Sequence, residues 1–239
     1  MTTNVTDLVS RQMASDSRWS VDMPEFVIYV DDTGFDKIFS AHDYAFMFAG
    51  DSGLIQTWKD WIAQLPDGNP APPITTDIAL CAVHIPTSTI RLDAHQEIKL
   101  PDEATFAGSG ARHAHGCWAT NRDAQRAIDT AKSLDIFSGG EIKYIKFGCR
   151  SHNLSNSARV TDLVDRFLSE GFMYNTRTGA AAVPLKQAAA NDEEVRKVVD
   201  GLKNGTVTAR APFKKSGAAW SASDMTALES IIADIKRKD

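Results

Sequence analysis

The sequence predicts a mixed α/β protein, and three observations lead to this prediction. Short apolar runs bounded by turn residues fill much of the first half of the 239-residue chain, as is typical of strands. Two stretches of that half instead repeat apolar residues at helical spacing. Residues 151–239 then change to mainly helical periodicity. With 43% hydrophobic residues, the chain is long enough to bury a substantial core.

The elements follow from these patterns in chain order. Apolar runs before or between turn residues predict strands at 24–30, 45–49, 77–85, 89–92, 97–100 and 142–147. Helical spacing of apolar residues predicts helices at 54–65, 111–134, 160–172, 192–202 and 224–235. The last of these begins after a Ser-Ala-Ser-Asp start signal and ends in Lys236-Arg237-Lys238, a charge placement that suits the helix dipole. We therefore divide the chain into a domain at 1–150 and a mainly helical extension at 151–239, packed on it.

Composition excludes several classes of function. The net charge is −5 and basic residues form no stripe, so we expect no nucleic-acid partner. No apolar run has the roughly 18–20 residues of a membrane-spanning helix, and the start of the chain has no signal-peptide pattern. Three cysteines, with no Cys-x-x-Cys pair, indicate reduced thiols. These observations predict a cytoplasmic protein with no membrane association.

Thr2 is the first residue that indicates chemistry. A small residue after an initiator methionine is compatible with methionine removal, which would leave Thr2 with a free α-amine. The pKa of an α-amine is ordinarily about 7.7–8.0, so it can act as a general base for the adjacent hydroxyl. A buried lysine would lower the pKa of this amine, because two like charges resist coexisting. Lys37 is a candidate for this lysine, and Asp16 is a candidate for the carboxylate that pairs with it.

Six short motifs occur in one order along residues 2–147. They are Thr2-Thr3, Ala14-Ser15-Asp16-Ser17-Arg18, Asp36-Lys37-Ile38, Ala49-Gly50, Gly108-Ser109-Gly110 and Asp135-Ile136-Phe137-Ser138-Gly139-Gly140. In this ordered set the chain resembles proteasome β-type and HslV-type subunits, the threonine branch of the N-terminal nucleophile (Ntn) hydrolases. The resemblance implies a four-layer αββα sandwich and a threonine peptidase or amidohydrolase acting on a peptide or amide.

The resemblance also implies a role for each matching residue. Thr2 would be the nucleophile, and Lys37 would lower the pKa of its amine while Asp16 bridges to Lys37. The N–H of Gly50 would help to form the oxyanion hole. Three further residues would support the N-terminus by hydrogen bonds: Ser109, Asp135 and Ser138.

Alternative functions stay open at this point. The region 54–76 has room for one helix where the family places two, and the extension at 151–239 is an addition. Both departures fit a non-catalytic member that has become a binding protein, such as an immunity protein or an assembly partner. An acylase of small molecules would share the same nucleophile. The sequence leaves open a homo-oligomer and a protein partner.

No metal or cofactor is expected. His113 and Cys117 would share one helix face, but a closed zinc site needs four ligands and no second pair has suitable spacing. Trp58 and Trp61, three residues apart, are typical of a core or interface stripe rather than a cofactor site.

Overall fold

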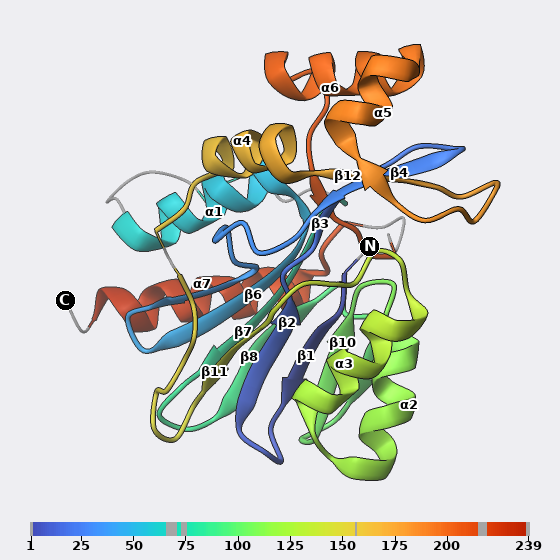
Figure 1. Ribbon diagram of the computed structural model, residues 1–239. Helices are drawn as coiled ribbons and strands as arrows, with labels where there is room; N and C mark the ends of the chain where they lie inside the picture. The colour runs from blue at the N-terminus through green and yellow to red at the C-terminus, as the bar shows by residue number, and fades with distance from the viewer. Residues whose placement is uncertain (1, 66–70, 73–75, 156, 215–218, 238–239) are drawn as a thin grey trace.

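Two antiparallel sheets form the centre of the protein in the computed structural model, which describes residues 2–65, 71–72, 76–155, 157–214 and 219–237 (Figure 1). The smaller sheet has the order β11-β2-β1-β10-β9. Its strands are β1 (Asn4–Asp7), β2 (Gln12–Asp16), β9 (Ile98–Leu100), β10 (Ala104–Ala107) and β11 (Ile142–Lys146).

The larger sheet has the order β13-β12-β4-β3-β14-β6-β7-β8, and β5 pairs with β6 beside this path. Its strands are β3 (Trp19–Asp22), β4 (Phe26–Val30), β5 (Ile38–Ala41), β6 (Tyr44–Asp51), β7 (Ile78–His84), β8 (Thr89–Ala94), β12 (Phe172–Asn175), β13 (Val183–Pro184) and β14 (Arg210–Ala211). Three of these strands, β12, β13 and β14, come from residues 151–239. The C-terminal part of the chain therefore adds strands to this sheet as well as helices.

Helices account for half of the remaining described chain. They are α1 (Ser52–Gln64), α2 (Ala111–Asn121), α3 (Ala124–Leu134), α4 (Val160–Glu170), α5 (Leu185–Asn191), α6 (Glu193–Asn204) and α7 (Ala222–Lys236). Asp51 begins α1, because its side chain accepts hydrogen bonds from the N–H groups of Gly53 and Leu54. The predicted helices at 54–65, 160–172, 192–202 and 224–235 are thus confirmed, with ends shifted by a few residues.

The prediction of one helix over 111–134 was wrong, since the chain forms two helices there. Arg122 adopts a left-handed conformation with φ 54°, which ends α2. Asp123 then caps α3 by accepting hydrogen bonds from the N–H groups of Gln125 and Arg126. The apolar periodicity continues across this break, which explains why the pattern alone indicated one helix.

Three apolar clusters hold these elements together. The first lies between α2, α3 and the smaller sheet, and includes the fully buried Trp118 and Phe106. The second lies between the two sheets, and Met13 of β2 and Met47 of β6 both belong to it. The third joins the larger sheet to α1 and to the C-terminal helices α4–α7. Within it the Trp58 and Trp220 rings stack at 5.7 Å, so α1 is tied to the segment before α7.

The helices of the described chain include none that is both long and apolar enough to cross a lipid bilayer.

Candidate functional site

Thr2 lies fully buried just before β1, where the two sheets meet. Its Oγ1 donates a hydrogen bond of 2.5 Å to Oδ1 of Asp16, the last residue of β2. Asp16 reaches Thr2 because β1 and β2 pair in antiparallel register, with Asn4 opposite Ser15. The turn between β1 and β2 sets this register and therefore brings the Asp16 carboxylate to Thr2.

Lys37 reaches the same carboxylate from the position just before β5 of the larger sheet. Its Nζ lies 2.9 Å from Asp16 Oδ1 and donates a second hydrogen bond of 2.8 Å to the Asp16 carbonyl oxygen. Both side chains of this ion pair are 0% exposed. Burial lowers the pKa of the Lys37 ammonium, and the charge of Asp16 opposes that shift. The pair therefore places a buried cation next to the hydroxyl of Thr2 through one shared oxygen.

Backbone donors hold the Asp16 carboxylate in place. Oδ1 also accepts the N–H of Thr3 at 2.8 Å. Oδ2 accepts the N–H groups of Arg18 and Gly139, each at 3.1 Å. Because both oxygens are bonded by fixed groups, the carboxylate has little freedom to turn away from Thr2.

A second group of side chains meets at Thr3. The hydroxyls of Thr3 and Ser138 lie 2.7 Å apart, and Ser138 Oγ donates to Asp135 Oδ2 at 2.8 Å. Ser109 Oγ donates to the same oxygen of Asp135. Asp135 follows α3 as its C-cap residue, and Ser109 lies in the turn before α2. Side chains of consecutive residues in an extended chain point to opposite faces, so Thr2 and Thr3 serve two different groups.

The turn at 108–110 packs so closely on Thr2 and Thr3 that it requires glycine. Gly108 has φ +96°, and a Cβ built on it would lie 1.9 Å from the Thr2 carbonyl oxygen. A Cβ on Gly110 would lie 1.9 Å from Thr3 Oγ1. The Gly110 N–H donates to the Thr2 carbonyl at 3.3 Å. This turn therefore fixes the backbone of the residues that carry both groups.

Six of the seven predicted site residues thus meet around Thr2 and Thr3, and Gly50 is placed differently. Among the described residues, no hydrogen bond joins Gly50 to Thr2. Gly50 has φ +136°, and a Cβ on it would lie 2.1 Å from the Asp77 carbonyl oxygen. Its ladder partners are Ile78 of β7 and Ala211 of β14.

Arg18 has a larger structural role than its motif position indicated. Its guanidinium donates two hydrogen bonds of 2.8 Å to the Asp31 carboxylate and one of 2.7 Å to the Ile136 carbonyl. The same group lies 3.8 Å from the centre of the Tyr29 ring. Asp31 could be identified from sequence only as a turn residue, and nothing in the local pattern indicates that it faces Arg18.

Metal binding has no support in the part of the chain that the structure describes. No group of three His, Cys, Asp or Glu residues there could hold a metal ion. Cys117 Sγ instead lies 3.0 Å from Asn121 Nδ2 and 3.0 Å from Thr130 Oγ1. His113 is exposed.

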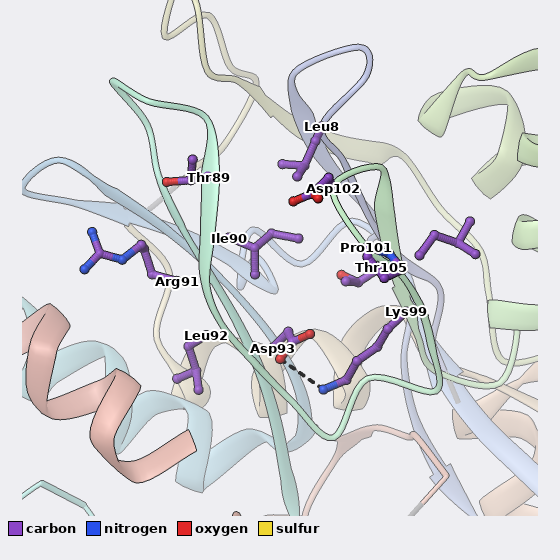
Figure 2. Close-up of a pocket in the computed structure, with 11 residues that line it drawn as sticks. Leu8, Thr89, Ile90, Arg91, Leu92, Asp93, Lys99, Pro101, Asp102 and Thr105 are labelled. Carbon is purple, nitrogen blue, oxygen red and sulfur yellow. Dashed lines mark ion pairs between the residues drawn. The ribbon is translucent and has the colours of Figure 1, made fainter. Parts of the chain in front are cut away.

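A separate cavity of about 500 Å³ opens between β8 and the turn after β9 (Figure 2). Lys99 Nζ and Asp93 Oδ1 form an ion pair of 3.0 Å across it, so these two charges neutralise each other. None of the predicted site residues lines this cavity. We therefore do not assign the chemistry to it.

Comparisons with known proteins give only distant similarities. No family model and no curated protein matches the chain. Among solved structures, the chain is similar to BPH from Thiobacillus denitrificans in complex with epoxomicin, with 13% identity, a TM-score of 0.42 and coverage of 61% of this chain and 97% of that one.

A second structure of Thiobacillus denitrificans BPH gives 14% identity and a TM-score of 0.41, covering 60% of this chain and 95% of that one. Eukaryotic HslV from Trypanosoma brucei gives 13% identity and a TM-score of 0.38, covering 60% of this chain and 99% of that one. These are loose likenesses to proteins of the kind that the sequence motifs resemble. Scores of this size do not establish a common mechanism.

Proposed function

We propose that the protein is a threonine-type peptidase or amidohydrolase whose nucleophile is Thr2. The observation that carries the proposal is the buried cluster in which Asp16 Oδ1 joins the Thr2 hydroxyl to the Lys37 ammonium, at 2.5 and 2.9 Å. Buried ionisable groups that share a polar cluster with a hydroxyl are typical of sites that activate a nucleophile. We include in the proposal a four-layer αββα sandwich, which the order of the three apolar clusters supports.

The proposed reaction requires that the peptide bond before Thr2 has been broken. The free α-amine of Thr2 then takes the proton of Oγ1, and Oγ1 attacks the carbonyl carbon of a peptide or amide. The C–N bond breaks, the proton passes to the leaving amine, and an ester forms on Thr2. Water hydrolyses this ester and restores the hydroxyl. Lys37 keeps the pKa of the amine low by its charge, and the Gly50 N–H stabilises the oxyanion.

Amide hydrolysis by protein whose chain begins at Thr2 tests this proposal. Such protein can be released from an N-terminal fusion and assayed on a set of fluorogenic peptide amides, with Thr2→Ala and Thr2→Ser beside it. We expect Thr2→Ala to lose at least about 10³-fold in turnover, while Thr2→Ser keeps measurable activity. Turnover by Thr2→Ala equal to that of the unchanged protein would contradict the assignment.

A non-catalytic binding protein is the second candidate, and one observation favours it. Thr2 is 0% exposed, so no substrate reaches its hydroxyl without a change in the structure. On this alternative, Thr2→Ala leaves partner binding intact and substitutions on the exposed faces of the helices in 151–239 remove it. The same Thr2→Ala protein therefore separates the two candidates. All seven predicted site residues lie in 1–150, which we propose as the domain that carries any chemistry.

A further inference from the structure

The strand β14 fills a gap in the larger sheet next to the predicted site. The strands β3 and β6 do not pair with each other, because β14 lies between them and pairs with both. Neighbouring strands lie about 4.8 Å apart, so β3 and β6 are separated by roughly 10 Å, the width of one strand. Without β14 the sheet would contain a slot bordered by two free strand edges.

The ladder register directs the Gly50 backbone toward this slot. Asp51 N–H donates to the Asp77 carbonyl on the β7 side, at 3.2 Å. Ser52 N–H donates to the Ala209 carbonyl on the β14 side, at 3.0 Å. Backbone groups alternate in direction along an antiparallel strand, so the N–H and C=O of Gly50 face Ala211, its ladder partner. The N–H that the proposed oxyanion hole needs is therefore turned toward this chain's own C-terminal segment.

The slot also borders the segment that carries Asp16. β3 begins at Trp19, directly after the Asp16–Arg18 segment, and its Ser20 is the ladder partner of Arg210. Ala209 and Ala211 are buried, with 2% and 0% of their surfaces exposed. An extended chain in this slot thus lies against the predicted oxyanion residue on one side and the strand that follows Asp16 on the other.

The hydrogen-bond ladder that holds this segment in the sheet is short. β14 has two ladder positions on β6 and one on β3. Beyond the ladder, Val207 N–H donates to the Gly201 carbonyl of α6 at 3.1 Å, Thr208 Oγ1 donates to Asp51 Oδ2, and Arg210 Nη1 lies 3.7 Å from Asp77 Oδ1. Ala209 and Ala211 also belong to the apolar cluster between the larger sheet and the helices.

Cavities lie on both sides of the segment. One of about 530 Å³ separates it from α4 and the end of α6, and one of about 460 Å³ separates it from the end of β3. Short pairing and open flanks are the features of a segment that opens at low free energy.

We propose that residues 206–212 form an internal plug and that an extended peptide binds by taking the place of β14 between β3 and β6. The inference deepens the proposed function, because it names an extended peptide as the ligand and closure by the chain itself as the regulation. Backbone pairing with both strand edges would supply the affinity, as in other cases of strand addition.

A reversible disulfide tests the plug directly. Arg210 and Ser20 are ladder partners whose backbone groups face each other, so their Cα atoms are about 5.5 Å apart, within the range of a disulfide. The variant Ser20→Cys/Arg210→Cys is made with Cys117→Ser and Cys149→Ser. Cys81 stays, since burial raises its pKa to about 11.

The probe is a fluorescent peptide with the sequence of residues 205–213, and Thr2→Ala in the same protein keeps the probe intact. We expect binding by the reduced protein and at least about ten-fold weaker binding by the oxidised protein. Equal binding in both states, or binding in neither, would overturn the plug.

Amide hydrolysis by the same cysteine pair with Thr2 restored separates this inference from the proposed function. Loss of turnover on oxidation and its return on reduction supports both. Peptide binding that depends on reduction, without hydrolysis in either state, leaves the plug standing and rejects the peptidase. Hydrolysis that does not respond to the disulfide rejects the plug and leaves the peptidase standing.

Hydrogen exchange provides a second test that needs neither activity nor a peptide. Ala211→Glu would place a carboxylate in a fully buried position, so we expect it to expel the plug. The amide of Ser52 should then exchange at least about ten-fold faster, because it loses Ala209 as its acceptor. Ala181→Glu, at an exposed position, is the matched control and should change nothing. Unchanged exchange at Ser52 in folded Ala211→Glu protein would count against the plug.

Discussion

Two buried lysines lie close together in the fold and are held in different ways. Lys37 Nζ is 2.9 Å from the Asp16 carboxylate and is fully enclosed. Lys59, on α1, donates instead to the backbone carbonyl of Asp36, the residue before Lys37, and lies 4.1 Å from the centre of the Phe35 ring. Burial lowers the pKa of both lysines, to about 8 for Lys59.

The two lysines differ in whether the counter-ion of the buried cation also holds a reactive group. At Lys37, the charge is matched by a carboxylate that also holds the Thr2 hydroxyl. At Lys59, a carbonyl and an aromatic face replace part of the lost hydration, and the charges of Asp36 and Asp60 oppose part of the pKa shift. Burial of a lysine is therefore not enough to indicate a site. What distinguishes Lys37 is the reactive group that shares its counter-ion.

Breaking the ion pair should have the largest effect on stability. Asp16→Asn leaves the Lys37 ammonium buried without a counter-charge, so we expect a loss of about 3–5 kcal/mol in the free energy of unfolding. Lys37→Met should lower the free energy of unfolding by a similar amount, because it leaves the Asp16 carboxylate buried without a counter-charge. The double variant should be clearly less destabilised than the sum of the two single variants.

Urea unfolding of the three proteins measures this coupling. Lys197→Met is the control, since Lys197 is 61% exposed and pairs with Glu194 at the surface, where a change within about 0.5 kcal/mol is expected. Additive losses in the double variant would show that Asp16 and Lys37 do not act as a pair.

Removing Lys59 should raise the free energy of unfolding rather than lower it. The lowered pKa of Lys59 means that folding at pH 7 holds a charged group that prefers water, so Lys59→Met should stabilise the protein by about 2–3 kcal/mol at that pH. Between about pH 8 and 10.5 the unfolded state binds the proton and the folded state does not. The unchanged protein should therefore gain stability as pH rises through this window, and Lys59→Met should lack that gain.

Unfolding curves at pH 7 and pH 10 give both quantities for each protein. The same pH dependence in Lys59→Met and in the unchanged protein would place the titration on another group.

Removing a hydroxyl that bonds Thr3 should have the smallest effect on the free energy of unfolding. Ser138→Ala removes the hydroxyl that bonds both Thr3 and Asp135 in a buried position, and we expect a loss of about 1–2 kcal/mol. Ser133→Ala is the matched control, because Ser133 is exposed on α3 and donates to the Thr130 carbonyl of its own helix, so a change within about 0.5 kcal/mol is expected. Thermal unfolding of the two variants side by side makes the comparison. Equal losses would assign no special role to the Thr3 group.

Local pattern predicted much of the fold but not its long-range pairing. Strands such as β4 and β7, and helices such as α4 and α6, carry the periodicity that their burial requires. β14 has two residues and no pattern of its own, so only its contacts with β3 and β6 make it a strand. The break at Arg122 was missed because apolar spacing continues through it, although Asp123 is a typical cap residue.

For the site, sequence reasoning found the residues but not all of their contacts. Thr2, Asp16 and Lys37 were predicted together from the ordered motifs, and their roles in a reaction stay predictions. The pairing of Thr3 with Ser138 depends on how the turn after α3 packs on β1, which no local pattern encodes. Lys59 was missed because it lies beside the apolar stripe of α1, where a lysine usually reaches solvent.

The most direct test of the account is the rate at which a peptide vinyl sulfone, which adds irreversibly to a hydroxyl, modifies Thr2 in protein whose chain begins there. Mass spectrometry of N-terminal peptides locates the adduct and follows its formation in the unchanged protein, in Lys37→Met and in Lys59→Met. If Lys37 serves Thr2 as proposed, modification of Thr2 falls by about 10²-fold in Lys37→Met and stays within about two-fold in Lys59→Met. Equal rates in all three proteins, or an adduct on another residue, would contradict the claim that the Asp16–Lys37 pair makes Thr2 a nucleophile.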